Sequence, residues 1–179
     1  MNTETKNNQL IDLCKKLKYN QNIVFSDEGN LNVPSDVSKD KQRSYAYSKP
    51  KGLWYSCGPV WIEYLTDDYK DQGQTWEKKR LAGMTHVYSL RLRRKFIYSI
   101  ETEKEFDIFA KRYARKDNQA VYWDKLDADG WKGIEIDWIP ERDKGWYDGW
   151  DCSSGCLWHP KAVKSIKLLL AWDYHFKKI

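Results

Sequence analysis

The segment 146–158 constrains the fold most, because it gathers three tryptophans and a tyrosine among glycines, cysteines and acidic residues. Large aromatic side chains are costly to expose, so this cluster needs a core or a ligand to cover it. Gly149 and Gly155 allow a sharp turn or a close approach. Two interpretations are open: a rigid loop that closes one end of the core, or a pocket wall whose rings hold a planar group. In the second, hydrogen bonds would come from Asp148, Asp151, Ser153 and Ser154.

The length of 179 residues fits a single domain over residues 1–179, with enough chain for a substantial core. Aromatic residues make up 15% of the chain, so we expect that core to hold many rings that carry polar atoms. A net charge of +5 makes an acidic partner plausible. Basic and acidic residues nevertheless alternate along most of the chain, which is typical of a solvated surface.

The chain has no apolar run long enough for a membrane span, and its first ten residues lack the apolar core of a signal peptide. We therefore expect an intracellular, cytoplasmic protein that does not enter membranes. In that compartment Cys14, Cys57, Cys152 and Cys156 would be reduced thiols.

Apolar periodicity predicts an α+β fold with a largely antiparallel sheet and flanking helices. Helices are expected over residues 5–18, from Pro59 to about Asp71, after a capping box at Thr102 and Glu105, and over residues 122–128. Strands are expected over residues 23–26, 53–57, 84–93, 96–100, 134–139, 155–158 and 165–172. Residues 167–170 lack alternation, which favours burial of the last strand on both faces, with a short helix as the alternative.

The polar, turn-rich segment 27–50 predicts a flexible loop, a lid or a binding loop. Its basic part, residues 39–51, interleaves Lys and Arg with Tyr45 and Tyr47. That combination suits phosphate neutralisation and base stacking on a nucleic acid, while a merely solvated loop is the alternative.

Cys152, Cys156 and His159 form the one metal-like spacing in the sequence, with a fourth ligand to be borrowed from Cys57 or His86. Reduced cysteines also serve as small apolar fillers, and we expect no metal. Cys57 precedes a predicted helix and could act as a nucleophile, although no base is joined to it by spacing. The phosphate-binding and hydrolase motifs that mark kinases, Rossmann enzymes and zincins do not occur.

Glu135 alternates with Ile134 and Ile136 on a predicted strand, so its side chain should point away from their face. A solvated carboxylate and a pocket acid are both compatible with that position.

Three short motifs, in their order along the chain, resemble those of the ADP-ribosyltransferase family. They are Ile-Val-Phe-Ser at residues 23–26, Lys-Gly-Leu-Trp-Tyr-Ser at 51–56, and Ser-Gly-Cys-Leu-Trp at 154–158. The resemblance implies split antiparallel sheets with flanking helices, and an activity that cleaves NAD+ and passes ADP-ribose to a macromolecular acceptor, protein or nucleic acid. Val24 stands where the family usually has His or Arg, and Ser154 and Gly155 stand where it has its catalytic Glu.

By this resemblance, Tyr55 with Trp54 or Trp150 would sandwich the nicotinamide ring. Asp151, or failing that Glu135, would be the carboxylate that stabilises positive charge at the ribose. Hydrogen bonds to the amide or ribose would come from Ser26, Ser153 and Ser154. Contacts to the pyrophosphate or to a nucleic-acid acceptor would come from Arg43, Lys49, Lys51 and Arg91.

The competing function is a catalytically silent binding module for nucleic acid or protein. It rests on the mild basicity and on the abundance of Trp and Tyr for stacking. A protein of a phage or other mobile element fits either function. The sequence leaves the acceptor and the oligomeric state open.

Overall fold

The structure is a computed structural model that describes residues 3–27, 29–31, 33, 49–67, 80–81, 83–139 and 145–172. The chain divides into two compact units. Unit 1 comprises Met1–Leu31, Ser56–Leu90 and Ser165–Ile179, and unit 2 comprises Asn32–Tyr55 and Arg91–Lys164. The single domain over residues 1–179 stays a prediction. Most of the predicted loop 27–50 lies outside the described residues.

Unit 1 contains the helices α1 (Thr3–Cys14) and α2 (Val60–Asp67). Both begin close to their predicted positions, but α1 ends four residues before the predicted Lys18, and residues 68–71 of the second predicted helix lie outside the described residues. Its strands are β1 (Asn22–Ser26), β3 (His86–Leu92) and most of β7 (Val163–Ala171), and β2 (Leu53–Cys57) contributes its last two residues. The strand order is β2-β1-β3-β7, with β1 antiparallel to both β2 and β3. The core of this unit includes Leu10, Ile23, Leu65, Val87 and Trp172.

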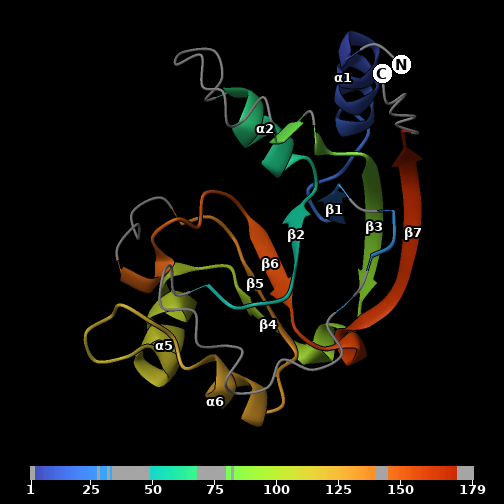
Figure 1. Cartoon of the computed structure of the whole chain (residues 1–179). Helices are drawn as coiled ribbons and strands as arrows, with labels where there is room; N and C mark the ends of the chain where they lie inside the picture. Colours follow the sequence, from blue (N-terminus) through green and yellow to red (C-terminus); the bar gives the residue numbers. More distant parts are fainter. Residues whose placement is uncertain are drawn as a thin grey trace, which may run out of the picture. The chain divides into compact units, whose positions relative to one another are not determined.

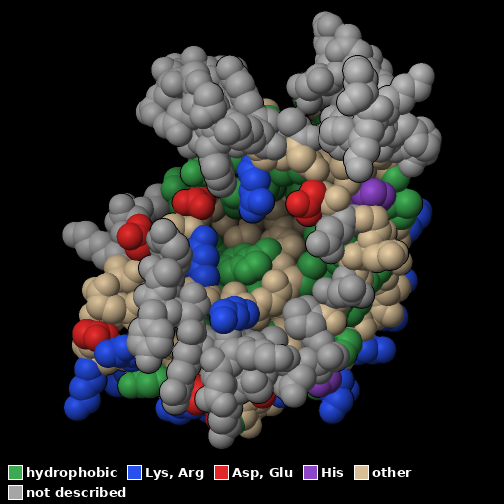
Figure 2. All heavy atoms as spheres, in the orientation of Figure 1, with side chains coloured by type: hydrophobic (Ala, Val, Ile, Leu, Met, Phe, Trp, Pro, Cys, Tyr) green, Lys and Arg blue, Asp and Glu red, His purple; other side chains and the backbone are tan. Residues whose placement is uncertain are grey.

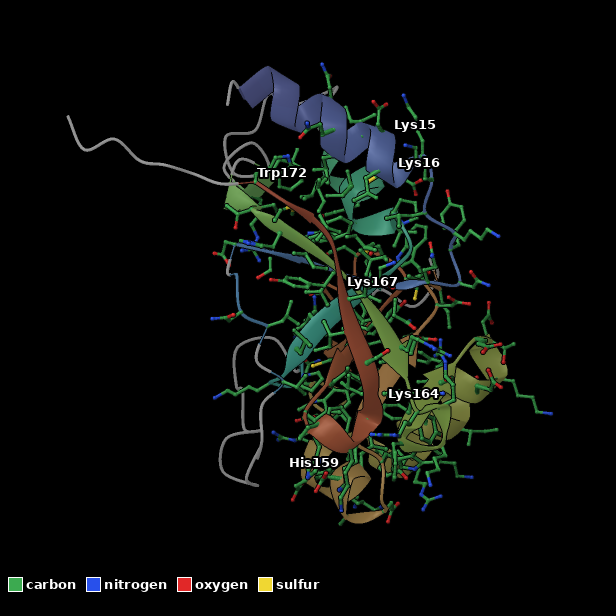
Figure 3. The ribbon with its side chains drawn as sticks, turned by 90° about the vertical axis from the view of Figure 1, so that its right-hand side faces the viewer. Lys15, Lys16, His159, Lys164, Lys167 and Trp172 are labelled. Carbon is green, nitrogen blue, oxygen red and sulfur yellow. The ribbon has the colours of Figure 1, made fainter. Side chains whose placement is uncertain are left out.

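The strand β7 differs from the prediction that it is buried on both faces. Lys164, Lys167 and Leu168 are exposed along it, and Leu168 keeps 50% of its surface. β7 is the last strand in the order and runs beside β3, as Figures 1 and 3 show. The apolar run 168–170 therefore led to a wrong prediction. A strand at the edge of a sheet can leave more of its side chains exposed than a central strand.

Unit 2 contains the strands β4 (Ile97–Ile100), β5 (Gly133–Ile136) and β6 (Ser154–Leu157), with the helices α5 (Glu103–Tyr113) and α6 (Trp123–Ala128). Short 3-10 helices cover Arg94–Phe96, Gly145–Tyr147 and Pro160–Ala162. The strand order is β4-β5-β6-β2, and α5 packs against β4 (Figure 1). The α+β prediction is confirmed.

The prediction of antiparallel sheets needs a correction, because β4 and β5 run parallel while β5 and β6 run antiparallel. The sheet is therefore mixed. Parallel strands need a long crossover connection, and here α5 and α6 provide it between β4 and β5.

The two faces of this sheet have different roles in unit 2. Ile134, Ile136 and Cys156 are fully buried and belong to the core that α5 and α6 cover. Gly133, Glu135 and Gly155 alternate with those residues and therefore lie on the opposite face. The predicted orientation of Glu135, away from Ile134 and Ile136, follows from this alternation.

The segment 146–158 lies mostly inside the core of unit 2. Trp146, Tyr147, Trp150 and Trp158 are each at most 3% exposed. Trp146 stacks on Phe106 from α5 with 5.0 Å between ring centroids. This burial agrees with the first of the two interpretations, an aromatic loop that closes the core.

The predicted capping box is present at the start of α5. The Thr102 side chain accepts a hydrogen bond from the Glu105 backbone, and the Glu105 carboxylate accepts from the backbone N–H of Thr102 at 3.0 Å. Together these two bonds satisfy donors that a helix N-terminus leaves unpaired.

We expect Thr102→Ala to lower the free energy of unfolding by about 1 kcal/mol, because the substitution removes the acceptor for the first turn of α5. Urea titration followed by circular dichroism measures this change. Thr102→Ser is the matched control, because it keeps the hydroxyl and should lose less than half as much. Equal losses for the two variants would contradict a role for the cap.

Within the described residues, no helix is both long and apolar enough to cross a membrane.

Candidate functional site

The candidate site is built around Glu135, a carboxylate on β5 that two donors hold. The Tyr55 hydroxyl donates to its Oε2 at 2.8 Å, and the Arg94 guanidinium pairs with its Oε1 at 2.6 Å. The Glu135 side chain keeps 16% of its surface, and that of Arg94 keeps 52%. We call Tyr55, Arg94 and Glu135 the Glu135 cluster.

Gly155 makes the contact between Tyr55 and Glu135 possible. In the strand order β6 lies between β5 and β2, and Gly155 on β6 pairs directly with Glu135 on β5. A Cβ on Gly155 would collide with the Tyr55 ring and hydroxyl and would approach the Ile134 carbonyl oxygen at 2.6 Å. The missing side chain therefore leaves the space through which Tyr55 reaches across β6.

The geometry of the Glu135 cluster suits a fixed negative charge. Hydrogen bonds to a charged group are shorter and stronger than neutral ones, and low exposure reduces screening by water. Each carboxylate oxygen receives its own donor, which fixes the orientation of the group. Such a group can stabilise a positive charge that develops beside it.

Unit 2 holds a second cluster of the same residue types, which we call the Asp129 cluster: Arg112, Tyr113 and Asp129. Oδ2 of Asp129 accepts from the Tyr113 hydroxyl at 2.7 Å and from Arg112 at 2.6 Å. The Tyr113 hydrogen bond and the nearby Arg112 lower the pKa of Asp129, while burial and the Asp129 bond raise the pKa of Tyr113 to about 12. Asp129 directly follows α6, so this cluster ties helix ends together. Because the Asp129 cluster has the same residue types, a substitution in it serves as a control for a substitution in the Glu135 cluster.

The arginines of residues 91–94 have three different surroundings. Arg91, a predicted phosphate contact, is exposed. Arg93 donates to the backbone carbonyls of Lys161 and Val163 at 3.2 and 2.7 Å. Arg94 pairs with Glu135. Sequence reasoning missed Arg94, because nothing in the run of basic residues separates it from its neighbours.

Trp54 and Trp150 lie together on the core side of the sheet, away from the Glu135 cluster. Their ring centroids are 5.0 Å apart in an edge-to-face contact, and both pack in the core of unit 2. Trp54 and Tyr55 are adjacent on β2, so their side chains point to opposite faces. The structure brings Tyr55 to Glu135 and Trp54 to Trp150, and it does not bring Tyr55 and Trp54 together as two walls.

The predicted serines make local contacts. Ser153 Oγ accepts from the Trp138 backbone at 2.9 Å, and Ser154 Oγ donates to the Cys152 carbonyl at 2.9 Å. Ser26 lies on β1 in unit 1, where it pairs with His86.

The charged residues predicted for the site differ in exposure. Asp151 and Lys51 are exposed, while the side chain of Lys49 turns onto Trp54 and Trp150. Arg43 lies outside the described residues. Figure 2 shows Lys and Arg side chains interspersed with Asp and Glu on the face in view, without separation by sign.

All four cysteines are free thiols. Burial raises the pKa of Cys152 to about 12 and raises that of Cys156 well above its usual range. His159 Nδ1 accepts a hydrogen bond from the Lys161 backbone at 3.0 Å. Among the residues that the structure describes, no group of three or more His, Cys, Asp or Glu side chains is arranged to hold a metal ion. Cys57, which the sequence offered as a possible nucleophile, is buried, with 8% of its surface exposed.

No protein-family model matches the chain, and neither a curated protein nor a solved structure matches it.

Proposed function

We propose that the chain is an ADP-ribosyltransferase-like enzyme that cleaves NAD+ and passes ADP-ribose to a protein or nucleic acid, with Glu135 as its catalytic carboxylate. The observation that carries the proposal is the Glu135 cluster. Two side-chain donors hold the Glu135 carboxylate, at 2.6 and 2.8 Å, and only 16% of its side chain is exposed.

Cleavage of the nicotinamide–ribose bond leaves positive charge on the ribose ring in the transition state. A carboxylate whose position is fixed before the reaction can stabilise that charge without reorganising. Tyr55 and Arg94 would act as positioning residues for Glu135, because they hold its two oxygens. Asp151, the first candidate from the sequence, is exposed, so water would weaken the same effect there.

We expect Glu135→Gln to lower the rate of nicotinamide release from NAD+ by about 100-fold or more, because it removes the charge but keeps the shape of the side chain. The measurement is release of labelled nicotinamide, with and without cell lysate as a source of acceptor. Asp129→Asn is the matched control. It removes the corresponding charge from the Asp129 cluster and should change the rate by less than about twofold.

Tyr55→Phe tests the positioning role separately, since it removes the hydroxyl and keeps the ring. This variant should lower the turnover number and leave the affinity for NAD+ nearly unchanged. Thermal melts establish that each variant is folded. If the wild type binds no NAD+ in calorimetry and releases no nicotinamide, the enzyme proposal fails. The Trp- and Tyr-rich binding module then takes its place.

A further inference from the structure

In unit 2, Arg93 joins the segment that follows β3 to the segment that leads into β7. Its guanidinium donates to the backbone carbonyls of Lys161 and Val163 at 3.2 and 2.7 Å. Its backbone N–H also donates to the Ala162 carbonyl at 2.8 Å. These three bonds fix Arg93 beside the 3-10 helix Pro160–Ala162, and the basic residues that flank both segments are held close together.

Five basic residues surround this connection, and we call them the basic patch: Arg91, Arg93, Lys95, Lys161 and Lys164. All of them are exposed. Arg91 and Lys164 lie on the neighbouring strands β3 and β7, each two residues from the backbone hydrogen bond between Arg93 and Ala162. Lys95 and Lys161 belong to two 3-10 helices that contact each other. Figure 3 shows Lys164 at the start of β7.

The two segments that carry the basic patch contain no acidic residue. Neither residues 78–100 nor residues 152–172 include Asp or Glu. Arg94 lies in the first segment but pairs with Glu135, so we leave it out of the patch. The chain has 31 Lys and Arg and 26 Asp and Glu, an excess of five positive charges, which equals the charge of the patch. The two signs therefore balance in number over the rest of the chain.

We propose that the basic patch binds the phosphate backbone of a double-stranded nucleic acid. Neighbouring cations attract a chain of phosphates and release its counterions. Single strands bind best where exposed aromatic rings let their bases stack. Among the described residues, the exposed aromatic side chains are Tyr19, Tyr122 and Trp138, and none of them lies in the two segments of the patch. A duplex keeps its bases stacked inside, so cations alone are sufficient to hold it.

The secondary structure of the basic patch favours binding without recognition of base sequence. Its two 3-10 helices have three residues each, and a major groove is read by a longer helix or by a two-stranded ribbon. Of the residues that the sequence suggested for phosphate contacts, Arg91 alone belongs to the patch. The proposal does not depend on the activity proposed for Glu135, because binding is measured without NAD+.

The test uses the full chain and a fluorescein-labelled DNA duplex of mixed sequence. Fluorescence anisotropy gives the dissociation constant between about 50 and 200 mM NaCl. The triple variant Lys95→Gln, Lys161→Gln and Lys164→Gln removes three charges of the basic patch. We expect it to bind at least about tenfold more weakly at the lowest salt concentration. The slope of log affinity against log salt should fall in magnitude by about 2.7, since each phosphate contact contributes about 0.9.

The matched control is the triple variant Lys104→Gln, Lys111→Gln and Lys116→Gln. It removes three exposed charges on and just after α5, in the same unit, and so changes the net charge of the protein equally. This variant should weaken binding by less than about threefold and leave the slope unchanged. Thermal melts establish that both variants are folded.

Three results overturn the proposal. The first is an equal loss of affinity in the two triple variants. The second is tighter binding of the wild type to the corresponding single strand than to the duplex. The third is binding to vesicles that contain phosphatidylserine with no binding to the duplex.

Discussion

Trp146→Ala should lower the free energy of unfolding by about 3–5 kcal/mol, or prevent folding of unit 2. The side chain is fully buried. The centroid of its ring lies 5.0 Å from that of Phe106 and 5.2 Å from that of Phe109. The indole nitrogen has no hydrogen-bond partner among the described residues. The loss is therefore one of apolar contacts and of a large cavity left in the core.

Chemical denaturation followed by near-ultraviolet circular dichroism measures this effect. Trp138→Ala is the control, because Trp138 comes from the same unit and is 53% exposed. Its substitution should cost less than about 1 kcal/mol. Similar losses for the two tryptophans would mean that the segment 146–158 does not form the centre of the core.

Gly155→Ala is expected to cost about 3 kcal/mol or more, although it adds a single methyl group. That group would collide with the Tyr55 ring and with the Ile134 carbonyl oxygen of the neighbouring strand. The backbone oxygen belongs to a paired strand and cannot move alone. Gly83→Ala is the control, since a Cβ on Gly83 would meet no atom within 4 Å. It should change stability by less than about 0.5 kcal/mol.

The double variant Tyr55→Ala and Gly155→Ala isolates the contact between these two residues. In the double variant the Tyr55 ring is absent, so the methyl group added at Gly155 collides only with the Ile134 carbonyl oxygen. The combined loss of stability should then be smaller than the sum of the two single losses. Additive losses would show that the glycine does not serve the approach of Tyr55 to Glu135.

Features set by neighbouring residues were predictable. The capping box depends on Thr102 and Glu105, three positions apart, and the orientation of Glu135 depends on strand alternation with Ile134 and Ile136. The parallel pairing of β4 and β5 was missed, because α5 and α6 are compatible with either strand direction until the pairing is known. Burial of β7 was overestimated, since composition does not reveal a strand's place in the sheet.

In the candidate site, too, individual residues were predicted from the sequence, but the contacts between them were not. Tyr55 and Glu135 were both named from the sequence, but for separate roles, because their contact depends on β6 lying between β2 and β5. Arg94 is 41 positions from Glu135 and belongs to a different element. Lys49 was expected to face a phosphate, and its position against two indole rings depends on the path of the segment 146–158.

The division of the chain has a consequence for its synthesis on the ribosome. Unit 1 takes its segments from both ends of the chain, while the segments of unit 2 end at Lys164. The strand order of unit 1 includes β7, so α1, β1 and β3 leave the ribosome before the strand that pairs with β3. At about 5–20 residues per second, β1 waits on the order of ten seconds for β7. During that interval Leu10, Ile23 and Val87 lack the contacts that Leu169, Leu170 and Trp172 give them in the folded unit, so part of the core of unit 1 stays exposed until the end of synthesis.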